Sequence, residues 1–180
     1  MNSFLRAWLR PIGLRFIRFT GQYDLTTARL RSLRDRGLRF EWAVDAGAAG
    51  GEWTKEFRRV FPDCKVLCVE PRSDVLPELR KVAKRLGRVE IAPVVLAEAE
   101  QELEFSVFAD QSSIMKNSQG RGFGDRTKVS SRRLDDLIRE SGAGWPDLLK
   151  FDVQGAELRC LRGAPESLEH AKAVLLEVQF

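Results

Sequence analysis

The chain has 180 residues, of which 43% are hydrophobic and 31% are charged, and its formal net charge is +4. That size supports one well-buried core rather than two, so we expect a single main domain. Because no N-terminal apolar run approaches the roughly 18 residues of a membrane span, and because Arg and Pro interrupt MNSFLRAWLRPIG, we expect a cytoplasmic protein without a transmembrane segment.

The first element is an Arg-rich segment over residues 1–39. Apolar residues from Leu25 to Leu33 recur at helical spacing and predict a helix that Gly37 ends. Such a basic start could be a nucleic-acid arm, an amphipathic segment on anionic lipid, or a solvated helix face, and we favour the solvated face. The first forty residues contain two acidic residues, Asp24 and Asp35, against nine arginines: Arg6, Arg10, Arg15, Arg18, Arg29, Arg31, Arg34, Arg36 and Arg39.

From residue 40 onward, strand-like and helix-like stretches alternate. This rhythm predicts an α/β fold with a mostly parallel sheet, right-handed crossovers and helices on both faces, over residues 40–180. Pro93 is unusual inside the third strand. The expected strands are 40–47, 64–71 and 89–97, and the expected helices between them contain Trp53 to Phe61 and Leu79 to Leu86.

The second half of the chain is less regular. ELEFSVF, 102–108, alternates polar and apolar residues and predicts an extra strand or hairpin arm, and the polar, glycine-rich stretch 110–125 is expected to be a long loop. In SSRRLDDLIRE we expect a helix with Ser131 as N-cap and two aspartates near its positive end. A strand at 148–155, a helix at 157–162 and a last strand at 173–180 complete the prediction.

Cysteine and histidine usage limits the chemistry. Three cysteines, Cys64, Cys68 and Cys160, lie inside apolar patterns, and an odd number gives no disulfide framework. Since His170 is the single histidine, a zinc site lacks ligands of the usual kind. We expect the cysteines to be reduced core residues and His170 to lie at a surface helix end.

The stretch DAGAAGGEWT, 45–54, is the first candidate site. In an open parallel sheet, ligands bind at the carboxyl ends of the strands, where the strand order reverses, and this stretch follows the first expected strand. Its glycines allow backbone to approach a ligand closely, and the following helix presents unpaired N–H groups. A tight strand-to-helix turn without a ligand is the alternative.

Acidic residues indicate which ligand would bind. Glu70 ends the second expected strand, where a carboxylate can accept both hydroxyls of a ribose. The stretch lacks the GxGxxG spacing that a dinucleotide requires, which argues against a nicotinamide-dependent oxidoreductase. Asp45 would be poorly placed against a pyrophosphate but well placed near a cationic amino-acid group. These features favour S-adenosylmethionine.

The motifs DAGAAGGEWT, VEP, SRRLDDL, LLKFDVQGAELRCLRGA and VLLEVQF together resemble, in this order, those of FkbM-type S-adenosylmethionine-dependent methyltransferases. The resemblance covers roughly residues 40–180, and KFDVQGAE is its most specific part. It implies a Rossmann-like class I methyltransferase fold and O-methylation of a hydroxyl on a sugar, lipid-linked or secondary-metabolite substrate, so a small-molecule or glycan acceptor is the expected partner. The expected cofactor-binding residues are Asp45, Gly47, Ala48, Gly51, Thr54, Glu70 and Pro71.

The sequence departs from the family pattern at three places. Ala49 stands where the family usually has Asn, and Gln154 replaces the usual Glu. Members of the family that the chain resembles normally continue into two more strands, so we expect this sheet to lack its last two strands. An uncovered edge at 173–180 would invite pairing, so we expect truncation, cover by the N-terminal segment, or a homodimer through this edge.

Methyl transfer to a hydroxyl also requires loss of a proton, and Asp152 is our first candidate for the acceptor side of the site. It could act as base, orient the acceptor, or hold a divalent metal with Glu177, although no metal is indicated. Strand alternation places Lys150 on the same face, where it is either catalytic or paired with a buried carboxylate. Glu157 is either catalytic or stabilises a helix dipole. In the long loop, Ser112 and Ser113 could contact substrate.

Two further function classes stay open at this point. One is a catalytically inactive S-adenosylmethionine-binding or scaffold protein, which binding without turnover would indicate. The other is a basic nucleic-acid-binding module, for which salt-dependent binding that requires residues 1–39 would be the sign. The methyltransferase is the prediction that we carry forward.

Overall fold

The computed structural model describes residues 17–18, 23–108, 111–113 and 126–177. Its main sheet has six parallel strands in the order β1-β10-β9-β2-β3-β4, which confirms the predicted mostly parallel α/β fold. These strands are β1 Ile17–Arg18, β2 Trp42–Ala46, β3 Lys65–Val69, β4 Val89–Ala92, β9 Leu148–Phe151 and β10 Ala173–Leu176.

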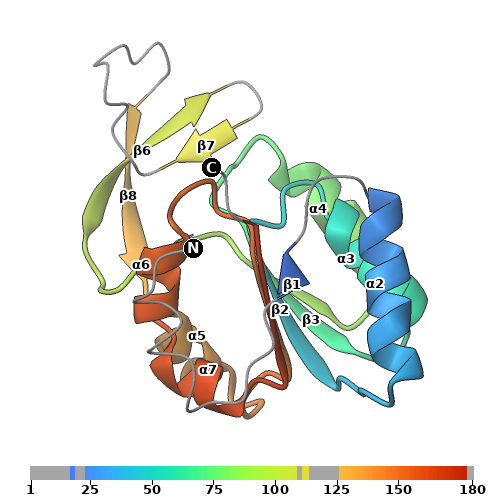
Figure 1. Cartoon of the computed structure of the whole chain (residues 1–180). Coiled ribbons are helices and arrows are strands. Elements are labelled where there is room, and N and C mark those ends of the chain that lie inside the picture. The colour runs from blue at the N-terminus through green and yellow to red at the C-terminus, as the bar shows by residue number, and fades with distance from the viewer. Residues whose placement is uncertain (1–16, 19–22, 109–110, 114–125, 178–180) are drawn as a thin grey trace.

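Three helices cover one face of the sheet: α2 Tyr23–Asp35, α3 Glu52–Val60 and α4 Leu76–Leu86 (Figure 1). Their buried residues Leu30, Phe57 and Leu79 pack with inward residues of the strands in one hydrophobic cluster. Gly37 follows α2 and Gly87 follows α4, and their φ values are 89° and 61°. Each of these two helices therefore ends where glycine accepts a conformation that other residues avoid. This half of the fold follows the sequence pattern closely.

The other face carries α5 Leu134–Ser141, α6 Glu157–Arg162 and α7 Pro165–His170 (Figure 1). Leu134, Ile138, Leu161 and Leu168 pack there with strand residues such as Phe151 in a second buried cluster. Because β2 and β9 lie between two layers of helices, every residue of both strands is buried. The expected helices on both faces are therefore confirmed.

A second, smaller sheet projects beyond the main one and contains β5 Val95–Leu96, β6 Glu102–Phe108, β7 Gln111–Ser113 and β8 Arg126–Arg132 (Figure 1). The predicted single strand over 89–97 was wrong, because it divides at Pro93 into β4 in the main sheet and β5 in the small one. Proline has no N–H for a sheet ladder, so the chain changes sheet there. The predicted loop over 110–125 was also wrong at Gln111–Ser113, which pairs with β6.

Ser131 does not cap α5. It lies in β8, where its hydroxyl donates to the carbonyls of Ala99 and Gln101 at 2.8 and 3.1 Å, and Arg133 takes the N-cap position without a side-chain hydrogen bond. The hydroxyl ties β8 to the segment before β6 instead. The predicted N-cap was therefore wrong because a long-range partner competes for the same side chain.

The exposed edge expected at β10 is covered in part by the chain itself. Ile17 and Arg18 of β1 pair in parallel with Leu175 and Leu176. Cover by the N-terminal segment, one of the three expectations, is therefore what the structure has, and a homodimer through this edge stays a prediction. None of the helices described is both long and apolar enough to cross a membrane.

Candidate functional site

The candidate site lies where β9, β2 and β3 end side by side. Asp45 of β2 is in register with Lys150 of β9 and with Cys68 of β3, and Glu70 directly follows β3. Asp152 directly follows β9, and its N–H donates to the Ala46 carbonyl at 3.0 Å. The parallel register thus gathers residues that are more than a hundred positions apart at one edge of the sheet.

The turn from β2 into α3 depends on backbone that only small residues allow. Gly47 has φ of 76°, and a Cβ there would meet the Asp152 carbonyl oxygen at 1.8 Å. Gly51, the N-cap of α3, has φ of 85° and would bring a Cβ to 3.0 Å from Leu79. Ala49 also has a left-handed φ, 45°, which favours glycine or asparagine over alanine. The resemblance leads us to expect Asn at this position, a residue that tolerates this conformation better than alanine does.

Glu70 closes over this turn. Its Oε2 accepts a hydrogen bond from the Ala49 N–H at 2.7 Å, and its Oε1 accepts one from the Arg72 N–H at 2.9 Å. The residue is only 4% exposed, and this burial raises the pKa of its carboxyl despite both hydrogen bonds. Pro71 follows it, half-buried. The loop and the end of β3 are therefore held together by one carboxylate.

Asp45 is fully buried and is engaged by two protein groups. Its Oδ2 accepts a hydrogen bond from the Thr54 hydroxyl at 2.6 Å, and its Oδ1 lies 2.9 Å from Lys150 Nζ. Oδ1 makes no hydrogen bond of good geometry among the residues described, so the ammonium is its charge partner. The cation that faces Asp45 in this structure is thus Lys150, and direct contact of Asp45 with a ligand stays a prediction.

Lys150 connects several parts of the site. Besides Asp45, its Nζ donates to the Gly47 carbonyl at 3.1 Å, lies 3.5 Å from Asp152 Oδ2, and sits 5.9 Å from the centre of the Trp53 ring. Burial by itself would lower the pKa of Lys150, but Asp45 and Asp152 outweigh it and the pKa is raised. Lys150 is therefore paired with the buried Asp45 carboxylate, as one of our two interpretations of this residue expected.

Asp152 stands at the open side of this group, with its side chain 26% exposed. Gln154, which has a left-handed φ of 52°, donates from Nε2 to Asp152 Oδ1 at 3.1 Å. Glu177 follows β10, the neighbour of β9, and its N–H donates to the Phe151 carbonyl at 3.0 Å. Burial and the adjacent Asp152 raise the pKa of the Glu177 carboxyl. Two carboxyl groups therefore meet at these strand ends.

The remaining predicted residues divide between this site and other places. Ala48 is buried beneath the turn, with its N–H donating to the Val69 carbonyl. Glu157 begins α6 and its Oε1 accepts from the Gly155 N–H at 3.0 Å, a contact that agrees with its helix-end interpretation. Ser112 and Ser113 belong to β7 in the small sheet, opposite Val107 and Ser106, and their role with substrate stays a prediction. No group of three potential metal-ligating side chains occurs within the described part of the chain.

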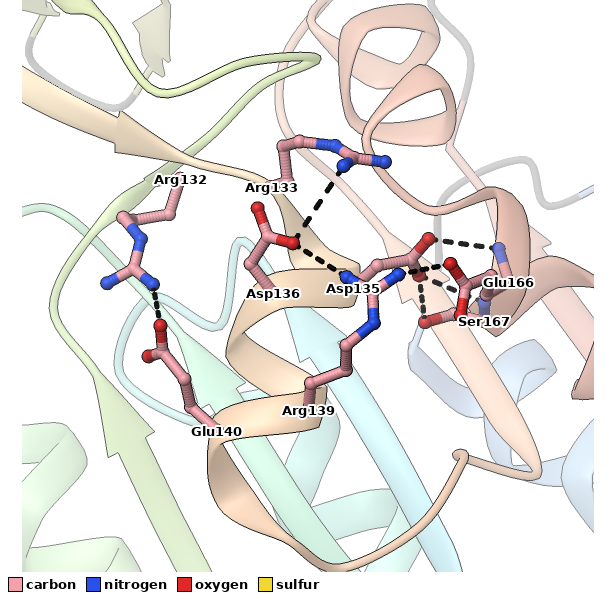
Figure 2. Close-up of polar contacts among 8 residues, drawn as sticks. All are labelled: Arg132, Arg133, Asp135, Asp136, Arg139, Glu140, Glu166 and Ser167. Atoms are coloured by element: carbon pink, nitrogen blue, oxygen red, sulfur yellow. Dashed lines mark hydrogen bonds and ion pairs between the residues drawn. The ribbon is translucent and has the colours of Figure 1, made fainter.

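The SRRLDDL motif contributes to folding at a different place (Figure 2). Asp135 is fully buried, and it accepts hydrogen bonds from the N–H groups of Glu166 and Ser167, both at 2.9 Å, and from the Ser167 hydroxyl at 2.6 Å. It therefore caps α7, whereas the sequence suggested only a contact with the dipole of α5. Its neighbour Asp136 faces outward and pairs with Arg139 and Arg133.

Comparison with known proteins agrees with this arrangement. The sequence model of the methyltransferase FkbM domain matches residues 45–180. The chain belongs to the FkbM methyltransferase family. This match begins at Asp45 and includes every strand end that forms the site.

The individual relatives that match this chain are distant. The chain is 24% identical to 2-O-methyltransferase NoeI of Sinorhizobium fredii, over 74% of this chain and 61% of that protein. It is 29% identical to methyltransferase sdnD of Sordaria araneosa, over 73% of this chain and 62% of that protein. Among solved structures, precorrin-6y C5,15-methyltransferase of Geobacter metallireducens is similar with a TM-score of 0.48 and 15% identity, over 93% of this chain and 68% of that one. The chain thus spans less than two thirds of the length of both relatives.

Proposed function

We propose that this FkbM-family chain uses S-adenosylmethionine to methylate a hydroxyl oxygen of a small molecule or glycan. The observation that carries the proposal is the meeting of the Gly47 to Gly51 turn, Glu70 and Asp152 at three adjacent strand ends. Open parallel sheets bind nucleotide-like ligands at this location.

The residues fit the adenosyl part of the cofactor. Each Glu70 oxygen accepts one backbone hydrogen bond, from Ala49 or from Arg72, and a carboxylate oxygen can accept two. Both oxygens can therefore also accept a ribose hydroxyl. Their fixed position matters because a carboxylate that is already oriented loses little freedom when it binds a diol.

Asp152 is suited to remove the proton from the acceptor hydroxyl. The cofactor supplies an activated methyl group, so the chain has to hold the acceptor in line and receive the proton that the oxygen loses. Lys150 and Gln154 hold the two Asp152 oxygens from either side. Glu177 follows the adjacent strand β10, and burial and Asp152 raise the pKa of its carboxyl.

The NoeI relative, named as a 2-O-methyltransferase, supports oxygen as the acceptor atom. To test this, the chain is incubated with S-adenosylmethionine that carries a labelled methyl group and with a panel of hydroxylated acceptors. We expect label in a product that survives mild alkali, as a methyl ether does and a methyl ester does not. Asp152→Asn should bind S-adenosylhomocysteine as tightly as the unaltered chain and transfer at least a hundredfold more slowly, within the range that general-base catalysis supplies.

A matched variant separates the base from a general effect of charge. Glu157→Gln removes a nearby carboxylate that accepts a hydrogen bond from the Gly155 N–H at the start of α6, so transfer should fall less than about threefold. Equal losses in the two variants would contradict the assignment of Asp152 as the base. Tight cofactor binding without transfer to any acceptor would instead favour an inactive binding protein.

A further inference from the structure

The Lys150 ammonium lies between several parts of the proposed site. It lies among groups from four parts of the fold: Asp45 in β2, the Gly47 carbonyl in the turn, Asp152 after β9, and the Trp53 ring in α3. The side chain itself is 9% exposed. A cation in this position is too deeply enclosed to be a surface charge and contacts both halves of the proposed site.

The contacts of Lys150 show more than an ion pair with Asp45, because they also connect the Gly47 to Gly51 turn with Asp152. Asp45 alone would neutralise the ammonium, at 2.9 Å. Lys150 nevertheless also donates to Gly47, whose backbone packs so tightly on Asp152 that a Cβ would overlap the Asp152 carbonyl oxygen. The third contact, 3.5 Å to Asp152 Oδ2, reaches the acceptor-side carboxylate. The Lys150 side chain therefore contacts both the Gly47 to Gly51 turn and the Asp152 carboxylate.

We propose that Lys150 is a positioning residue that fixes the Gly47 to Gly51 turn and the Asp152 carboxylate relative to each other. It contacts neither the methyl donor nor the acceptor, and it acts through the groups that do. This inference rests on the proposed function where it concerns cofactor affinity. Where it concerns the order of the turn, it can be tested without any ligand.

The test uses a double variant, because Lys150→Met alone would leave Asp45 as a buried, unpaired charge and could prevent folding. Asp45→Asn combined with Lys150→Met removes both charges, and the Asn oxygen can still accept from the Thr54 hydroxyl. The matched control is Lys172→Met, which breaks a Lys–Asp pair of 2.7 Å to Asp147 at the opposite end of the same strands.

Amide hydrogen exchange measured by NMR reports the order of the turn directly. In the unliganded double variant we expect the N–H groups of Ala49, Gly51 and Asp152, which are all hydrogen-bonded, to exchange at least tenfold faster. The N–H of Val66 in β3 serves as the reference within the same molecule. Calorimetric titration should show S-adenosylhomocysteine binding weakened at least tenfold, while Lys172→Met changes neither quantity by more than about twofold.

The outcomes separate this inference from the proposed function. Unchanged exchange of the three amides in the folded double variant would overturn the positioning role, as would faster exchange with unchanged cofactor affinity. If the unaltered chain binds no S-adenosylhomocysteine but the three amides still respond to the double variant, the proposed function is wrong and the positioning role of Lys150 is supported.

Discussion

Replacing Asp135 by alanine tests whether the first aspartate of SRRLDDL acts through folding. Its carboxylate accepts three hydrogen bonds from the start of α7, two from Ser167 and one from the Glu166 N–H (Figure 2). These donors are 31 and 32 residues away in sequence, so the cap joins α5 to α7. Asp136 is the natural control because it is the adjacent aspartate, and its contacts with Arg139 and Arg133 are on the surface.

The expected magnitude follows from those contacts. Asp135→Ala leaves three hydrogen-bond donors without an acceptor, and each unsatisfied buried donor costs about 1–3 kcal/mol. The Glu166 N–H is only partly buried, so its cost lies at the lower end of this range. We expect the free energy of unfolding to fall by about 3–5 kcal/mol. Asp136→Ala removes half-exposed ion pairs and should cost less than about 1 kcal/mol.

Chemical denaturation, followed by circular dichroism, measures both losses in the same way. Since about 4 kcal/mol is a large part of the stability of a typical domain, Asp135→Asn provides a milder step. It keeps one oxygen for Ser167 and loses the bond from the Glu166 N–H, so its cost should be intermediate. If Asp135→Ala and Asp136→Ala destabilise the chain equally, the capping role is refuted.

Three further predictions follow from the turn and from the buried thiols. Gly47→Ala should abolish cofactor binding and strongly reduce expression of folded protein, because its Cβ would overlap the Asp152 carbonyl oxygen; a folded variant with normal affinity would show that the turn can move. Ala49→Gly should raise the free energy of unfolding by about 0.5–1 kcal/mol, because it relieves the strain of an alanine with a left-handed φ. The control Ala83→Gly, inside α4, should lower the free energy of unfolding by about 1 kcal/mol. Equal effects of the two variants in thermal melts would show that the backbone at Ala49 is not strained. Burial raises the pKa of the Cys64, Cys68 and Cys160 thiols to about 12, so at pH 8 roughly one thiol in 10⁴ is ionised. A thiol reagent should therefore label these cysteines only after the chain unfolds. Fast labelling of the native chain would contradict their placement in the core.

Much of the fold could be predicted from local patterns. The helices α2, α3 and α4 end where proline or glycine follows their apolar repeat, and the buried strands β2, β3 and β9 are short apolar runs. The small sheet could not be predicted in the same way. Pro93 signalled a break, but the new partner of the chain beyond it is Ser131 in β8, a long-range pairing that no local pattern specifies.

The site was predicted in part for the same reason. Strand ends in a parallel sheet meet, so Glu70 and Asp152 could be expected near the turn that begins at Gly47. The partners of these side chains could not be derived, because they depend on register and depth. Asp45 lies opposite Lys150 and is enclosed with it, although its position in the sequence suggested a residue that faces a ligand.

The proposed cofactor site can be tested by calorimetric titration of S-adenosylhomocysteine into the unaltered chain and into a matched pair of variants, Glu70→Ala and the exposed Glu78→Ala. We expect the unaltered chain to bind. Removing the Glu70 carboxylate should lower the affinity at least tenfold, about 1.4 kcal/mol, and removing the Glu78 carboxylate in α4 should leave the affinity unchanged. Absence of binding in the folded, unaltered chain, or equal affinity in Glu70→Ala, would contradict the proposed cofactor site.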